Sequence, residues 1–130
     1  MYRCPLCQQS LTQHHNSFVC AANHSFDLAK EGYLHLLPVQ QKNSKVPGDS
    51  PLMMQSRRDF LNAGYYQPLS DAVNHMFSEV LPAQASLLDL GCGEGYYSAR
   101  AATALSGVEV YGLDISKTAV RYASKRYQNL

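Results

Sequence analysis

The clearest hydrophobic pattern lies in the C-terminal part of the chain. Short apolar runs at 86–90 and 107–113 predict two strands, the first of them buried. Small and aromatic residues at 96–105 predict a helix between these strands, and Ser116 is a good N-cap for a further helix. Strand, helix and strand in this order indicate an α/β fold with parallel strands.

Two helices are predicted upstream of the first strand. Ser50 and Pro51 form a helix start, and this helix runs to about Ala63. Pro68 starts the second helix and Pro82 ends it. The residues expected to face the core are Met53, Met54, Phe60, Leu61, Leu69, Ala72, Val73, Met76, Phe77 and Val80. We expect Arg57 and Arg58 to be exposed, either on a solvated face or against phosphate.

A glycine-rich turn follows the first strand, within LLDLGCGEGYY at 87–97. Gly91, Gly93 and Gly95 permit tight backbone angles and the close approach of a ligand. Strand, turn and helix together present backbone N–H groups and a helix N-terminus to a nucleotide-like ligand.

An acidic residue accompanies this turn at the end of the next strand. Asp114 lies about 25 positions after Asp89, near the spacing at which an acid accepts hydrogen bonds from ribose hydroxyls. With the DLGCGEG stretch, the pattern resembles motif I of class I S-adenosylmethionine-dependent methyltransferases. The other interpretation is a glycine turn in an ordinary α/β protein. Asp89, Asp114 and the glycines are the candidate cofactor-binding residues.

Metal-ligand spacing marks the N-terminal part. Cys4 and Cys7 form a C-x2-C pair, and Cys20 and His24 form a C-x3-H pair twelve residues later. Four such ligands suit one tetrahedral, structural Zn²⁺, and a hairpin around 14–16 would separate the pairs. A module of about forty residues needs such a metal because its core is small. The alternatives are free thiols or a redox CxxC pair.

Composition and charge limit the location and the domain organisation of the protein, but they identify no reaction. The formal charge of +1 neither demands nor excludes nucleic acid. Because no apolar run nears the roughly 18 residues of a membrane span and the N-terminus lacks a signal-peptide core, we expect a cytosolic protein with no membrane partner. The expected domains are a zinc-binding module at 1–40, a linker at 41–49 that is solvated or contacts a partner, and a methyltransferase part at 50–130.

Seven segments of the chain, taken in order, closely resemble the N-terminal half of bacterial 23S rRNA (guanine-N1)-methyltransferases. They are CPLC, Cys20, His24, DLAKEGYLHLLP, PGDS, MMQSRRDFLNAGYYQPL and LLDLGCGEGYY. The resemblance implies zinc at the Cys/His set, an N-terminal RNA-recognition module and S-adenosylmethionine in the second domain. It places cofactor contacts on Tyr66, Glu94 and Gly95; the other interpretation of Tyr66 is ordinary packing. It also implies methyl transfer to N1 of a guanine in a 23S rRNA hairpin, by proteins that can pair as homodimers.

The expected fold is therefore α/β, with a small zinc-binding module followed by a truncated, Rossmann-like class I methyltransferase domain. Two strands of about seven are expected, so we expect this chain alone to be inactive and to leave apolar surface and a strand edge uncovered. No catalytic base can be named from the sequence. Two other functions stay open: a zinc-containing methyltransferase for a small molecule or protein, and a non-enzymatic, zinc-dependent RNA-binding module.

Overall fold

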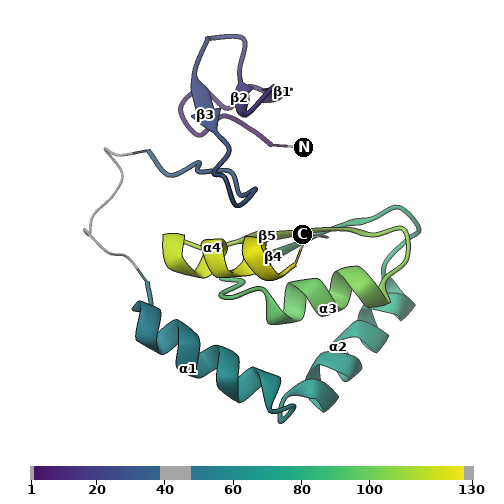
Figure 1. The fold of residues 1–130 in the computed structure, drawn as a ribbon. Coiled ribbons are helices and arrows are strands. Elements are labelled where there is room, and N and C mark those ends of the chain that lie inside the picture. The colour runs from purple at the N-terminus through teal and green to yellow at the C-terminus, as the bar shows by residue number, and fades with distance from the viewer. Residues whose placement is uncertain (1, 39–47, 128–130) are drawn as a thin grey trace. The chain divides into compact units, whose positions relative to one another are not determined.

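The computed structural model describes residues 2–38 and 48–127. The chain divides into two compact units, Met1–Lys45 and Val46–Leu130, which are considered separately (Figure 1). Most of the predicted linker at 41–49 lies outside the described residues.

The first unit is a small antiparallel sheet of three short strands. β1 (Thr12–His14) pairs with β2 (Ser17–Val19), and β2 pairs with β3 (Ser25–Asp27). The turn between β1 and β2 includes His15 at φ 52°, in the left-handed region. The predicted hairpin around 14–16 is thus confirmed.

The core of this unit is made largely of the candidate metal ligands. Cys4 and Cys20 are buried together with Leu11. Partly buried side chains pack against them, namely Cys7, Phe18, Phe26 and Leu36. A module this small has no other fully buried apolar side chain among its described residues, so its core and its thiols occupy the same space.

The second unit is built on two parallel strands joined by a helix. β4 (Ser86–Leu90) leads to α3 (Tyr96–Ala104), which leads to β5 (Glu109–Leu113) and then α4 (Lys117–Arg126). Asp89 is in register with Gly112, so the carboxyl ends of both strands lie at the same edge of the sheet. The strand–helix–strand prediction is confirmed, and Ser116 caps α4 by accepting a hydrogen bond from the Ala119 N–H at 3.2 Å.

Two helices precede the sheet. α1 (Pro51–Asn62) begins at Ser50, whose hydroxyl accepts a hydrogen bond from the Met53 N–H at 3.2 Å, and α2 (Gln67–Val80) follows after a short turn. α2 packs on α3, and α1 contacts α4 (Figure 1). The buried cluster of this unit contains Ala101, Leu105 and Val110, with Phe77, Leu81, Leu87, Ala102 and Val108 packed around it.

The predicted inward face of α2 is wrong in part. Leu69, Met76 and Val80 are exposed, and the buried positions of α2 are Ser70 and Asn74. The Ser70 hydroxyl accepts a hydrogen bond from Arg100 Nε on α3 at 2.8 Å, so part of the buried face of α2 is polar. Met53 and Phe60 of α1, also expected in the core, are exposed, whereas Met54 and Leu61 are buried.

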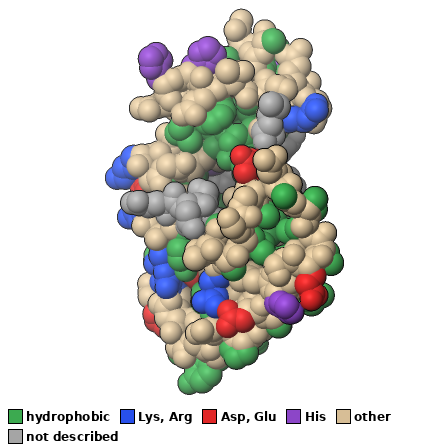
Figure 2. Space-filling view, turned by 90° about the vertical axis from the view of Figure 1, so that its right-hand side faces the viewer, with side chains coloured by type: hydrophobic (Ala, Val, Ile, Leu, Met, Phe, Trp, Pro, Cys, Tyr) green, Lys and Arg blue, Asp and Glu red, His purple; other side chains and the backbone are tan. Residues whose placement is uncertain are grey.

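The strand β4 is also less buried than predicted. Leu88 and Leu90 are exposed, as are Leu113 and Ile115 beside them, because the two-stranded sheet leaves apolar side chains uncovered. Figure 2 shows hydrophobic side chains (green) at the molecular surface. In the part of the chain that the structure describes, no helix combines the length and apolar character needed to cross a bilayer.

Candidate metal centre and cofactor site

The structure brings the four predicted metal ligands together. The ligand atoms of Cys4, Cys7, Cys20 and His24 all lie within 4.8 Å of one another. Cys4 Sγ is 3.5 Å and Cys20 Sγ is 3.4 Å from His24 Nδ1, and Cys7 Sγ is 3.6 Å from Cys20 Sγ. The two pairs meet because the C-x2-C turn and the turn after β2 lie against each other across the core.

These distances fit a tetrahedral Zn²⁺ ion. Zinc bonds of about 2.3 Å to sulfur and about 2.0 Å to nitrogen place two tetrahedral sulfurs about 3.8 Å apart and a sulfur and a nitrogen about 3.5 Å apart. Three thiolates and one imidazole are also a common structural zinc donor set. The arrangement therefore suits a closed structural site and leaves no ligand position for a substrate.

The thiols of the cluster differ in acidity. Burial raises the pKa of Cys4, but N–H groups of its own turn donate to the sulfur and bring the pKa below its ordinary value. Cys20 behaves in the same way, with the His24 N–H as the main stabilising donor against burial. The Gln9 N–H lowers the pKa of Cys7, but burial and the neighbouring thiols outweigh it and raise the pKa overall. Bound Zn²⁺ would favour the thiolate at all three positions.

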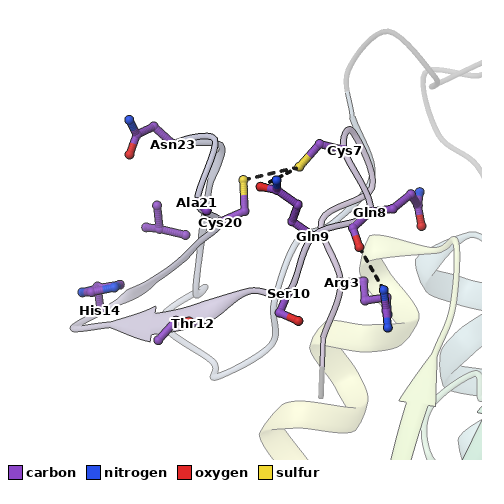
Figure 3. A pocket seen from close by; sticks show the side chains of 11 residues that line it. Arg3, Cys7, Gln8, Gln9, Ser10, Thr12, His14, Cys20, Ala21 and Asn23 are labelled. Atoms are coloured by element: carbon purple, nitrogen blue, oxygen red, sulfur yellow. Dashed lines mark hydrogen bonds between the residues drawn. The ribbon is translucent and has the colours of Figure 1, made fainter.

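An open groove of about 740 Å³ lies beside this cluster (Figure 3). Most of its lining residues have polar side chains, including Arg3, Gln8, Gln9 and Asn23, and Cys7 and Cys20 also line it. Amides and a guanidinium offer donors and acceptors of the kind that read base edges and phosphates.

The glycine turn of the second unit has the backbone that its sequence predicts. Gly91, Gly93 and Gly95 have φ of 80°, 59° and 84°, a region that other residues rarely adopt. Gly95 is the N-cap of α3 and donates its N–H to the Cys92 carbonyl at 3.0 Å. A Cβ added at Gly91 or Gly93 would meet no other atom within 4 Å, so both glycines border open space that a ligand can enter.

The two candidate acids hold this turn in place. Asp114 accepts hydrogen bonds from the Gly93 N–H at 2.9 Å and from the Ser116 N–H at 2.7 Å. Asp89 accepts one from the Ser98 hydroxyl at 2.6 Å, which ties β4 to α3. Both acids thus lie at the turn, as predicted, and both have structural partners there.

Cys92, inside the turn, is a packing residue. Its Sγ lies 2.9 Å from where a Cβ on Gly112 would stand, so the neighbouring strand needs glycine at that position. Burial, reinforced by the carboxylates of Asp89 and Asp114, raises the pKa of Cys92 to about 12. This thiol is therefore protonated and unreactive at neutral pH.

The side chain of Glu94 points into the protein. It is 1 % exposed, and its Oε2 accepts hydrogen bonds from Arg58 Nε at 2.9 Å and Arg126 Nη1 at 3.3 Å. Because the side chain is buried, only the backbone of Glu94 can contact a ligand at the turn. The expectation that Arg58 is exposed is wrong, because this ion pair draws its side chain inward to 18 % exposure; Arg57 is 54 % exposed, as expected.

Tyr66 lies at the corner between α1 and α2. Its ring packs edge-on against Phe60 with centroids 5.4 Å apart, and the residue is 43 % exposed. The packing interpretation therefore holds for part of the ring, and the exposed part leaves a surface for a ligand. Tyr66 also acts electrostatically on Tyr97 of α3, whose pKa is raised mainly by burial and further by Tyr66 and Tyr96.

Comparison with known families agrees with both sites. Residues 2–45 match the family model described as "RlmA, N-terminal", a zinc ribbon. Residues 82–130, which include the glycine turn and Asp114, match the model described as "Methyltransferase domain". The fold and the two sites define a zinc-ribbon protein with a class I methyltransferase domain, a class that uses S-adenosylmethionine and structural zinc.

Three curated relatives of the chain have names that state the same kind of reaction. The chain is 32 % identical over 127 residues to the "23S rRNA (guanine(748)-N(1))-methyltransferase" of Streptomyces fradiae, covering 96 % of this chain and 44 % of the relative. It is 31 % identical to the "Putative 23S rRNA (guanine-N(1)-)-methyltransferase" of Micromonospora griseorubida, over 96 % of this chain and 48 % of the relative. It is also 31 % identical to the "Putative 23S rRNA (guanine-N(1)-)-methyltransferase YxjB" of Bacillus subtilis (strain 168), over 100 % of this chain and 48 % of the relative. The chain is therefore similar, along almost its whole length, to proteins named as 23S rRNA (guanine-N1)-methyltransferases. It spans about half the length of these relatives.

Proposed function

We propose that the whole protein transfers a methyl group from S-adenosylmethionine to N1 of a guanine in a 23S rRNA hairpin. The observation that carries the proposal is the joint presence, in one chain, of the four-ligand cluster and the glycine turn with Asp114. The chain is also 32 % and 31 % identical to relatives whose printed names state this reaction. Such a substrate implies a cytosolic location, and the homodimer that the resemblance implies remains a proposal as well.

The proposed zinc ligands are Cys4, Cys7, Cys20 and His24. Their contacts support this role because the four ligand atoms converge within one buried core. The role of the metal is to hold the three short strands together, so that the groove beside it keeps its shape.

The proposed cofactor contacts surround the glycine turn. The open space at Gly91 and Gly93 admits the ligand, and the backbone of Glu94 and Gly95 opens α3 toward it. Asp114 has one lone pair on each oxygen beyond its present bonds for ribose hydroxyls. The exposed part of the Tyr66 ring provides an aromatic surface for the ligand.

The chemistry follows from the donor. S-adenosylmethionine supplies an activated methyl group on a sulfonium, so the protein must align guanine N1 with it and let the N1 proton leave. A guanine in an RNA loop can be splayed out of its stack to reach such a site. The task of this chain in that reaction is to hold the donor at the turn and to bind the RNA through the zinc module.

The groove beside the zinc cluster is the proposed RNA-contact surface. Arg3 suits a phosphate, and the amides of Gln8, Gln9 and Asn23 suit the base edges of unpaired nucleotides. With a formal charge of only +1, the chain relies on such local contacts more than on a general electrostatic attraction.

A methylation assay tests the proposed function. Purified whole protein is incubated with 23S rRNA transcripts and labelled S-adenosylmethionine, and the product is digested to nucleosides for mass spectrometry. We expect 1-methylguanosine at one hairpin and a large loss of product when Cys20→Ser removes a zinc ligand. Methylation of a different atom, or of a metabolite with rRNA ignored, would refute the proposal and favour a different methyltransferase.

A further inference from the structure

The buried carboxylate of Glu94 joins three segments that are far apart in sequence. It belongs to the glycine turn, Arg58 belongs to α1, and Arg126 belongs to α4. Arg58 also donates from Nη2 to the Tyr122 carbonyl of α4 at 3.1 Å, and its guanidinium lies 4.5 Å from the centroid of the Tyr122 ring. Arg58 therefore contacts the turn and α4 at the same time.

Arg126 makes a parallel but more exposed connection. Its Nη1 lies 3.3 Å from Glu94 Oε2, and its Nη2 donates to Asn62 Oδ1 at the end of α1. The Arg126 side chain is 32 % exposed, against 18 % for Arg58. Arg58 is thus the better shielded partner and has the shorter contact, so it carries more of the interaction.

The carboxylate depends on these arginines. Oε2 accepts both guanidinium bonds, and Oε1 is buried with no hydrogen-bond partner among the described residues. A buried carboxylate that loses its main cationic partner must move toward water or take up a proton. Without Arg58, the longer and more exposed contact from Arg126 would remain on Oε2.

Any movement of Glu94 moves the turn itself. Gly93, on one side of Glu94, donates its N–H to Asp114 at 2.9 Å, and Gly95, on the other side, caps α3. Gly93 borders the proposed cofactor site, and Gly95 begins the helix that faces it. The position of the Glu94 side chain is thereby coupled to the backbone groups proposed to meet the ligand.

We propose that Arg58 is a positioning residue for the cofactor site, which acts through Glu94 to fix the glycine turn against α1 and α4. This inference rests on the proposed binding of S-adenosylmethionine at that turn. Arg58 does not contact the cofactor in this account. Its loss weakens cofactor binding because the turn no longer has one fixed conformation.

The test compares two adjacent arginines in the whole protein. Arg58→Met keeps an unbranched apolar stem and removes the guanidinium, and Arg57→Met is the matched control, since Arg57 is exposed and pairs only with Asp49 among the described contacts. S-adenosylhomocysteine binding is measured by calorimetry well below the melting temperature of each variant. We expect the dissociation constant to rise at least about tenfold in Arg58→Met, which is about 1.4 kcal/mol, and less than about twofold in Arg57→Met.

Two further variants separate positioning from general stability. Arg58→Lys keeps a charge that reaches Glu94 but cannot also bind the Tyr122 carbonyl, so we expect an intermediate dissociation constant. In a double-mutant cycle, Arg58→Met should add less than about threefold to the effect of Glu94→Gln, because both changes break one interaction.

The outcomes are distinguishable. A folded Arg58→Met protein with a lower melting temperature and an unchanged dissociation constant would show a merely structural role and overturn the inference. Multiplicative effects in the double-mutant cycle would do the same. If the wild-type protein bound neither S-adenosylmethionine nor S-adenosylhomocysteine, the proposed function itself would fail, and the inference with it.

Discussion

Removal of zinc should unfold the first unit and leave the second folded. Seven side chains make up the hydrophobic cluster of the first unit, and three of these are the candidate cysteine ligands. The strands around them are three residues long each, too short to be stable by themselves. The metal is therefore expected to supply most of the folding free energy of this unit.

The magnitudes support this expectation. Leu11, at 6 % exposure, is the one fully buried side chain of the cluster that is not a cysteine, and its burial contributes about 2 kcal/mol. A structural zinc ion contributes on the order of 10 kcal/mol in small modules. A strong chelator should therefore shift residues 2–38 from folded to unfolded at room temperature.

Heteronuclear NMR of the labelled chain gives a residue-specific assay, with metal content measured in parallel. Chelation should collapse the amide signals of 2–38 to random-coil positions and leave those of 51–126 dispersed. Cys20→Ser should reproduce this result, whereas Cys92→Ser, the matched cysteine control outside the cluster, should keep one zinc per chain. Dispersed signals of 2–38 in protein free of metal would refute the reasoning.

Three smaller changes test the second unit. Gly95→Ala places a Cβ at φ 84° and should cost about 1–2 kcal/mol in urea unfolding and weaken cofactor binding; unchanged stability would contradict the assigned backbone. Ser116→Ala removes the acceptor for the Ala119 N–H and should cost about 1 kcal/mol in the same assay, with Ser116→Thr as a control that keeps the cap. Because the pKa of Cys92 is raised to about 12, its thiolate is scarce at pH 8, and alkylation of the zinc-loaded protein should be about a thousandfold slower than for a free cysteine, accelerating about tenfold per pH unit up to pH 10. Alkylation at the rate of a free cysteine, levelling off above about pH 9, would show that the pKa of Cys92 is not raised.

Local features of the fold could be read from the sequence. Ser86–Leu90 is a strand with the predicted bounds, and Ser50 and Ser116 cap helices, because strand runs and caps depend on adjacent residues. The positive φ angles at Gly91 and Gly95 follow from the glycine pattern for the same reason. The metal cluster could also be predicted, since the C-x2-C and C-x3-H spacings are typical of a tetrahedral zinc site.

Features that depend on tertiary contacts could not be predicted from the sequence. The apolar stripe of α2 predicted a buried face, but the buried positions are Ser70, which binds Arg100 of α3, and Asn74. Arg58 and Glu94 are 36 positions apart, and no periodicity connects them. The sequence shows two adjacent arginines in α1 and an acid inside the glycine turn. Nothing in the sequence identifies them as partners in an ion pair.

The most direct test of the account is where S-adenosylmethionine binds. The labelled whole protein is titrated with the cofactor, and amide shifts are followed residue by residue. We expect saturable shifts that are largest from Gly91 to Gly95 and at Asp114, with residues 2–38 unaffected. Saturable binding that left the glycine turn and Asp114 unperturbed would contradict this expectation.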